Sequence, residues 1–114
     1  MASVAELKTV LQSITVEAKN IYGEKLSSII LFGSYARGDN TDESDIDIMI
    51  LLDCDKQEVD SFREETRNMA DDISLDSDFF VSILLRDKKN FEDKQDFLPF
   101  YKNVVREGVK IYGR

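Results

Sequence analysis

Hydrophobic residues recur along the chain at spacings that predict an alternation of helices and strands. The first set is spaced by three and four residues, as in an amphipathic helix, and consists of Val4, Leu7, Leu11, Ile14, Ala18 and Ile21. Ser3 and Glu6 have the spacing of a helix capping box, and Gly23 is a typical stop residue. These signals predict one helix that ends near residue 23.

Three nearly continuous apolar runs predict buried strands at residues 26–32 (LSSIILF), 46–52 (IDIMILL) and 79–85 (FFVSILL). Helical spacing returns over residues 56–74 and again from Pro99 to Gly108, and residues 109–112 can form a short edge strand. Strands that are apolar on both faces need helices on both sides. The pattern therefore predicts an α/β (α+β) fold, with a small mixed sheet of three to four strands covered by helices, in a single domain over residues 1–114.

Composition narrows the chemistry that this domain can carry out. The 114 residues include no histidine and one cysteine, Cys54. That excludes Ser-His-Asp catalysis, imidazole or multi-thiolate metal sites and an internal disulfide. The chain contains no long apolar run and its start has no signal-peptide features, so we expect a cytoplasmic protein without a membrane anchor. Any bound metal is expected to be a hard cation held by carboxylates.

The negative charge is concentrated in one part of the chain. The formal net charge is −8, and residues 38–60 contain nine acidic side chains against one basic one. The rest of the sequence is nearly balanced. Because direct nucleic-acid binding requires a basic surface, this distribution argues against it.

The candidate chemistry lies in residues 33–47, GSYARGDNTDESDID. A strand that runs into Gly33-Ser34 can hold a phosphate on backbone N–H groups, although a plain glycine turn looks the same in sequence. Asp45 and Asp47 lie at i and i+2 and would share one face of a strand. Such a pair is either a solvated strand end or a site for a cation, because adjacent carboxylates repel. Together, the two features favour phosphoryl or nucleotidyl transfer with metal ions.

Nine positions of this segment, GS-x-ARG and SDID, resemble the signature of the minimal nucleotidyltransferases, which belong to the DNA polymerase β-like nucleotidyltransferase superfamily. The resemblance continues through residues 100–113. It implies the polymerase β-like fold, a nucleoside triphosphate donor such as ATP, a two-metal Mg²⁺ site, and attack of a hydroxyl on the α-phosphate with loss of pyrophosphate.

The resemblance also assigns roles to individual residues. Gly33 and Ser34 would hold the triphosphate, and Asp45 and Asp47 would be catalytic metal ligands. Arg37 would contact phosphate or instead form a salt bridge with one of the nearby acids, which are Asp39, Asp42 and Glu43.

The superfamily's third carboxylate is the weak point of the match. Ser82 occupies the position that aligns with it. Asp78 has the same strand parity and is the candidate third catalytic residue, but it lies about 13 Å away along an extended strand. Two alternatives to an active enzyme follow. One is a catalytically weak regulatory module that binds nucleotide and metal, and the other is a Ca²⁺-binding acidic loop over residues 39–47, which lacks EF-hand spacing.

The resemblance further implies a partner. Small members of the family often work with a helical protein of the HEPN type, and some are antitoxins that attach AMP to it. The acceptor would then be a hydroxyl of a protein or of a small molecule. A homodimer is a further option.

Overall fold

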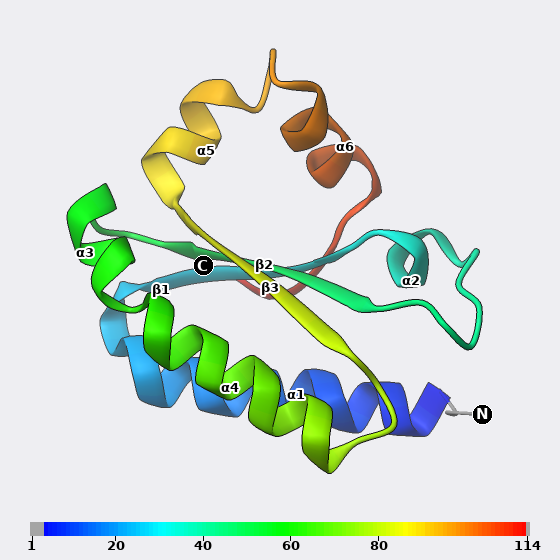
Figure 1. Ribbon diagram of the computed structural model, residues 1–114. Helices are drawn as coiled ribbons and strands as arrows, with labels where there is room; N and C mark the ends of the chain where they lie inside the picture. Colours follow the sequence, from blue (N-terminus) through cyan, green and yellow to red (C-terminus); the bar gives the residue numbers. More distant parts are fainter. Residues whose placement is uncertain (1–3, 114) are drawn as a thin grey trace.

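The computed structural model describes residues 4–113, which form helices and strands in alternation (Figure 1). In chain order they are α1 (Val4–Tyr22), the 3-10 turn η1 (Gly23–Lys25), β1 (Leu26–Phe32), α2 (Ser34–Arg37), β2 (Ile46–Leu52), α3 (Lys56–Ser61), α4 (Arg63–Asp76), β3 (Val81–Asp87), α5 (Lys88–Lys94), α6 (Pro99–Glu107) and β4 (Val109–Gly113).

The four strands form one mixed sheet in the order β3-β2-β1-β4. β1 is antiparallel to both β2 and β4, whereas β2 and β3 are parallel. The parallel pair requires a crossover, which α3 and α4 supply. Figure 1 shows α1 and α4 on one face of the sheet and α5 and α6 on the other. The predicted mixed α/β fold with a helix-covered sheet, including the short edge strand, is confirmed.

Strand β2 is buried on both faces, which explains its nearly continuous apolar sequence. The face toward α1 and α4 is fully buried and consists of Ile46, Ile48, Ile50 and Leu52. On the opposite face, Met49 and Leu51 pack with Phe91 of α5 and with residues of α6. The close packing on both faces therefore holds the first residues of β2, including Asp47, in a fixed position.

Helix α1 ends at Tyr22, before Gly23, as the sequence predicts. Its buried residues are Val10, Ile14, Ala18 and Tyr22, while Val4 is 76% exposed. Ser3 lies outside the described residues, so the capping box stays a prediction. Across residues 4–113, no helix combines the length and the apolar character needed to cross a membrane.

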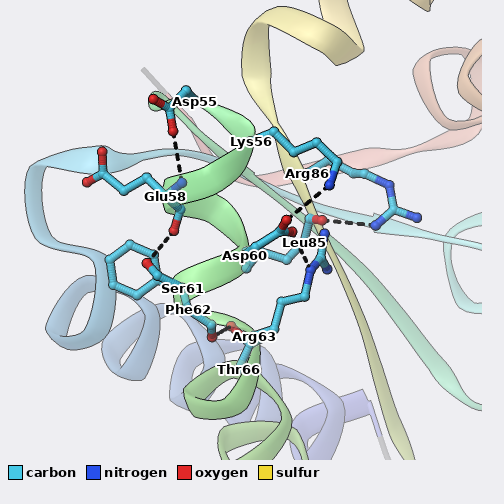
Figure 2. Close-up of polar contacts among 10 residues, drawn as sticks. All are labelled: Asp55, Lys56, Glu58, Asp60, Ser61, Phe62, Arg63, Thr66, Leu85 and Arg86. Carbon is cyan, nitrogen blue, oxygen red and sulfur yellow. Dashed lines mark hydrogen bonds and ion pairs between the residues drawn. The ribbon is translucent and has the colours of Figure 1, made fainter.

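The helix predicted over residues 56–74 is in fact two helices, and this prediction was wrong. In a continuous helix the Phe62 amide would donate to the Glu58 carbonyl, but the Ser61 hydroxyl donates to that carbonyl instead (Figure 2). The Phe62 amide donates to the Val59 carbonyl at 3.0 Å, which is a tighter turn. The Phe62 ring then packs edge-on against Tyr22, with centroids 5.3 Å apart. The residue between α3 and α4 therefore packs against α1 through its ring.

An ion-pair bridge spans the same break. Figure 2 shows Asp60 between Lys56 and Arg63, and its carboxylate accepts hydrogen bonds from their side chains at 3.0 and 2.8 Å. The hydrogen bond from Lys56, followed by that from Arg63, lowers the pKa of Asp60. These exposed contacts join the end of α3 to the start of α4.

The third strand begins later than predicted, and a helix that was not predicted follows it. The strand is Val81–Asp87 rather than residues 79–85, because its pairing with β2 begins where Ile46 lies opposite Val81. Residues 88–94, for which the sequence pattern predicts no element, form α5. Asp87 caps this helix by accepting from the Asn90 amide, and Phe91 is its one buried residue. A helix with a single apolar anchor has no periodic signature in the sequence.

Because α5 is held by this single buried ring, Phe91→Ala should destabilise the fold by about 3–5 kcal/mol, the usual cost of truncating a core phenylalanine. Urea denaturation measures the change. Lys89→Ala, an exposed position on the same helix, is the matched control and should stay within about 0.5 kcal/mol of the wild type. Equal losses in the two variants would contradict the anchoring role of Phe91.

Candidate active site

A tight glycine-flanked turn joins the end of β1 to α2. Gly33 has φ 74° and Gly38 has φ 84°, a region of backbone conformation that favours glycine. The amides of Ala36 and Arg37 both donate to the Gly33 carbonyl at 3.1 Å. The N–H groups of Ser34 and Tyr35 come before the amides that close this turn and are not used in closing it. The turn therefore has the backbone donors that a phosphate group requires.

The first acidic residue of β2 lies directly against this turn. In the antiparallel pairing of β1 and β2, Phe32 lies opposite Asp47. A Cβ atom added at Gly33 would collide with the Oδ2 atom of Asp47. The residue at position 33 must therefore lack a side chain for two reasons, its backbone conformation and the carboxylate beside it. The structure brings the predicted phosphate turn and one predicted metal ligand together.

The two predicted metal ligands differ in their surroundings. Asp45 is exposed just before β2, and Asp47 is half-buried within it. Partial burial raises the pKa of Asp47, the negative charge of Asp45 raises it further, and Arg37 opposes both. The carboxylates are thus close enough to repel, and a cation between them would relieve the repulsion.

Arg37 forms ion pairs that tie α2 to the end of α6. Its Nε atom lies 3.1 Å from Oδ2 of Asp39, and one terminal nitrogen lies 3.4 Å from Oε2 of Glu107. The hydrogen bond to Asp39 is the main cause of a raised pKa of Arg37. Among the three acids that the sequence offers as ion-pair partners of Arg37, the structure pairs it with Asp39. Glu107 was missed because it is 70 residues away along the chain.

The strand register identifies what stands at the third-carboxylate position. Ser82 of β3 lies directly beside Asp47 in the parallel pairing of β2 and β3. Asp78 is exposed in the segment before β3. Within residues 4–113, no three carboxylate, cysteine or histidine side chains come together as a metal-binding group. The structure therefore brings Asp45 and Asp47 together without gathering Asp78 into a three-carboxylate cluster.

The structure also contains a hollow of about 660 Å³ that was not anticipated from the sequence and whose lining includes neither Asp45 nor Asp47. It is bordered by the loop before β2 and by the segment before β3, and its lining consists of Tyr35, Asn40, Thr41, Asp42, Glu43, Ser44, Asp78, Phe79 and Phe80. The Tyr35 and Phe79 rings meet edge-on, with centroids 5.9 Å apart. The feature of the sequence that could have indicated this hollow is the pair of phenylalanines, Phe79 and Phe80, that precede β3.

Comparison with known proteins identifies the family. Residues 15–111 match the model of the nucleotidyltransferase domain, so the chain belongs to that family and is a transferase. Two candidate protein adenylyltransferases of Methanocaldococcus jannaschii are similar to it. MJ0604 is 35% identical over 94 residues, which are 82% of this chain and 86% of that protein. MJ0141 is 33% identical over 108 residues, or 93% and 99% of the two chains.

Solved structures support the same fold. A candidate nucleotidyltransferase from Sulfolobus solfataricus has a TM-score of 0.56 at 20% identity, over 97% of this chain and 86% of that one. A toxin–antitoxin structure with AMP-PNP has a TM-score of 0.52 at 25% identity, over 91% and 73%. The resemblance to minimal nucleotidyltransferases that the GS-x-ARG and SDID segments indicate is confirmed.

The contact between position 33 and Asp47 can be isolated with two matched variants. Gly33→Ala and Gly38→Ala both place alanine at positive φ, which costs about 1–2 kcal/mol. Only Gly33→Ala also collides with a side chain, because nothing lies within 4 Å of a Cβ at position 38. Gly33→Ala should therefore lower stability by at least about 1 kcal/mol more than Gly38→Ala in chemical denaturation. Equal losses would show that the carboxylate moves away at no cost.

The raised pKa of Asp47 makes a prediction about stability and pH. Ionised Asp47 is less stable in the folded chain than in the unfolded chain, so its charge lowers the free energy of unfolding at neutral pH. This destabilisation disappears below the unfolded pKa of an aspartate, near 4, where the carboxyl is protonated in both states. In EDTA at pH 7, Asp47→Asn should stabilise the protein by up to about 1 kcal/mol, limited by solvent screening. The gain should vanish toward pH 3.5. Thermal unfolding at both pH values measures it.

The control for this experiment is Asp71→Asn, an exposed carboxylate on α4. A gain at pH 7 no larger than that of Asp71→Asn would contradict the electrostatic penalty at Asp47.

Proposed function

We propose that this chain, acting as one nucleotidyltransferase domain, transfers AMP from ATP to a hydroxyl of a protein or small-molecule acceptor. The observation that carries the proposal is the contact between Asp47 and the Gly33 turn, with Asp45 alongside. In the reaction, the acceptor oxygen forms a bond to the α-phosphorus while the bond from that phosphorus to the α–β bridging oxygen breaks. Pyrophosphate leaves with the electron pair, and the hydroxyl proton passes to solvent.

The two carboxylates fit magnesium. Mg²⁺ in proteins is commonly held by one or two carboxylates together with substrate phosphates and water. Asp45 and Asp47 supply this number of hard oxygen ligands, and their mutual repulsion favours a cation between them. Magnesium bound there supplies neutralisation of the charge on the triphosphate. A two-metal arrangement needs further ligands from the substrate, because residues 4–113 contain no three-carboxylate group.

The turn after β1 provides the triphosphate site in this proposal. The N–H groups of Ser34 and Tyr35 and the Ser34 hydroxyl are the donors, and the bare α-carbon of Gly33 permits close approach. Arg37 contributes positive charge to the same turn. Its ion pairs with Asp39 and Glu107 must loosen if it is to contact phosphate directly.

The alternative is a regulatory module that binds nucleotide and metal but transfers slowly. Ser82 favours this alternative because it stands beside Asp47, where the superfamily has its third carboxylate. Asp78 as a substitute third ligand remains a prediction; it is exposed before β3, and residues 4–113 contain no three-carboxylate group that would include it with the pair.

The proposed partner is a helical protein of the HEPN type, modified by AMP transfer as a toxin is by its antitoxin. The similarity to a toxin–antitoxin structure with AMP-PNP supports both the adenine nucleotide and the protein partner. The similarity to candidate protein adenylyltransferases supports a protein acceptor.

The test uses ATP labelled at the α-phosphate, Mg²⁺, and the protein with and without the product of its neighbouring gene. Wild type should transfer AMP, and the double variant Asp45→Asn, Asp47→Asn should lose more than about 100-fold of the rate, because it lacks both metal ligands. The control is Asp71→Asn with Asp72→Asn, two exposed positions on α4. It removes the same two negative charges as the active-site double variant but leaves both proposed metal ligands in place.

Calorimetry with Mg²⁺ and AMP-PNP separates the two candidate functions. Nucleotide binding without transfer would favour the regulatory module, and loss of transfer in Asp78→Asn alone would identify the third ligand. Equal transfer by wild type and the Asp45, Asp47 double variant would reject the enzyme assignment.

A further inference from the structure

A β-bulge near the start of β1 places two serine side chains on the same face of the sheet. Leu26 of β1 lies opposite Leu52 of β2. Two residues later Ser28 lies opposite Leu51, only one residue along β2, so Ser27 is the extra residue of the bulge. Neighbouring side chains of an unbroken strand point to opposite faces. Here both serines line one hollow together with Leu51, on the face that α5 and α6 cover (Figure 1).

The hydroxyl groups of these two serines are open to that hollow. Ser27 and Ser28 are buried, at 3% and 6% exposed, which is unusual for serine. Within residues 4–113, neither hydroxyl takes part in a side-chain hydrogen bond. In the same part of the chain, no side-chain oxygen or nitrogen is completely shielded without a hydrogen-bond partner. The two hydroxyls are therefore accessible from the hollow, and each has a proton to donate.

The rest of the hollow provides an apolar surface of fixed shape. Its volume is about 300 Å³, which suits a small molecule. The apolar residues of its lining come from β1, β2, α5 and α6, and they are Ile30, Leu51, Phe91, Val104 and Val105. Three of them, Leu51, Phe91 and Val104, are buried core residues. An occupant would therefore place an apolar body against side chains that packing already holds in position.

Two lysines bring positive charge to the same hollow. Lys88 is the first residue of α5, and Lys110 lies on β4 opposite Ile30. A Cβ atom added at Gly113 would collide with the aliphatic stem of Lys110, so this stem runs along β4 over Gly113. Because Gly113 lies opposite Ser28, the stem carries the ammonium group toward the serine end of the hollow.

The balance of charge indicates the class of ligand. Neither Lys88 nor Lys110 forms an ion pair within residues 4–113. Glu92 is the one acidic residue among the described residues that line the hollow, so the lining has a net charge of one positive unit. A carboxylate matches that charge and accepts hydrogen bonds from hydroxyl and ammonium groups. A dianionic phosphate would leave a negative charge without a partner beside Glu92.

This hollow is separate from the candidate active site. Ser28 precedes Phe32 by four residues, and Phe32 is the residue of β1 that lies opposite Asp47. Four residues of extended strand span about 13 Å. Neither Asp45 nor Asp47 nor any residue of the turn from Gly33 to residue 38 lines the hollow.

We propose that the hollow between the sheet, α5 and α6 is a second ligand site, which takes a small carboxylate with an apolar body. The hydroxyls of Ser27 and Ser28 donate hydrogen bonds to the carboxylate. Lys88 and Lys110 supply the compensating charge, and the apolar body packs against the core residues of the wall. The proposal does not depend on the proposed function.

The probes are benzoate, its neutral counterpart benzamide, and inorganic phosphate. Each is titrated into ¹⁵N-labelled protein, and binding is followed through the backbone amide signals in NMR spectra. Benzoate should shift the signals of Ser27, Ser28 and Lys110 and bind at least about 10-fold more tightly than benzamide, because only benzoate forms charge-assisted hydrogen bonds. Equal binding of benzoate and benzamide, or tighter binding of phosphate than of benzoate, would overturn the proposal.

Matched lysine variants test the source of the charge. Lys88→Met with Lys110→Met keeps the length of both side chains and should weaken benzoate binding about 10-fold. Lys89→Met with Lys102→Met removes two exposed lysines of α5 and α6 that do not line the hollow, and should leave the affinity unchanged. Equal weakening by the two double variants would mean that benzoate responds only to the overall charge, which contradicts a built site.

A second pair of variants tests the place of binding without altering the buried serines. Val105 and Val109 are similarly exposed, at 55% and 50%, but only Val105 lines the hollow. Val105→Trp should obstruct the hollow and weaken benzoate binding at least about 10-fold, whereas Val109→Trp should bind as the wild type does. Undiminished binding in Val105→Trp would place the ligand elsewhere and overturn the proposal.

A competition experiment distinguishes this site from the nucleotide site. Benzoate should bind with the same affinity in the presence of saturating Mg²⁺–AMP-PNP. An apparent Kd for benzoate that rises in proportion to the AMP-PNP concentration would assign the hollow to the nucleotide site and overturn a second site. Failure of Mg²⁺–AMP-PNP to bind at all would count against the proposed function alone, because the benzoate titration needs no nucleotide.

Discussion

The site depends on one close contact, between the α-carbon of Gly33 and the carboxylate of Asp47. The contact joins the end of β1 to the start of β2, so it exists only if the two strands pair in a single register. That register is enforced by the core, because a slip of one residue would turn Ile48 and Ile50 out of it. The glycine turn and the Asp47 carboxylate are therefore adjacent because of packing among residues elsewhere in the core.

The same arrangement has an electrostatic cost, which the scaffold offsets. Asp47 is half-buried, faces the charge of Asp45, and belongs to a strand that is otherwise apolar. A strand buried on both faces, between α1 and α4 on one side and α5 and α6 on the other, can hold such a group in place (Figure 1). The acidic excess of residues 38–60 divides between the two ends of β2: Asp39, Asp42, Glu43, Asp45 and Asp47 lie at the site, whereas Asp53, Asp55, Glu58 and Asp60 lie after β2 and on α3.

The parts of the fold that the sequence predicted are those in which one periodic signal dominates. Strands 26–32 and 46–52 have the bounds expected from their apolar runs. The sequence pattern was less informative where individual contacts decided the outcome: the helix predicted over 56–74 is broken, the strand predicted at 79–85 begins at Val81, and the helix over 88–94 was not predicted. The Ser61 hydroxyl took the carbonyl that the Phe62 amide would have used, pairing with β2 set the start of β3, and one buried ring held α5. Such contacts depend on partners far away in the chain, which local periodicity does not record.

By itself, the sequence determined the mixed α/β class, the glycine turn, and the position of Asp45 and Asp47 at the beginning of the second strand, because turn chemistry and strand patterns are local. The tertiary structure alone decided that Asp47 lies against Gly33, that Ser82 stands beside Asp47, and that Arg37 reaches Glu107. Each of these depends on which strands and helices become neighbours, and that choice is made by burial of the whole core rather than by any one segment.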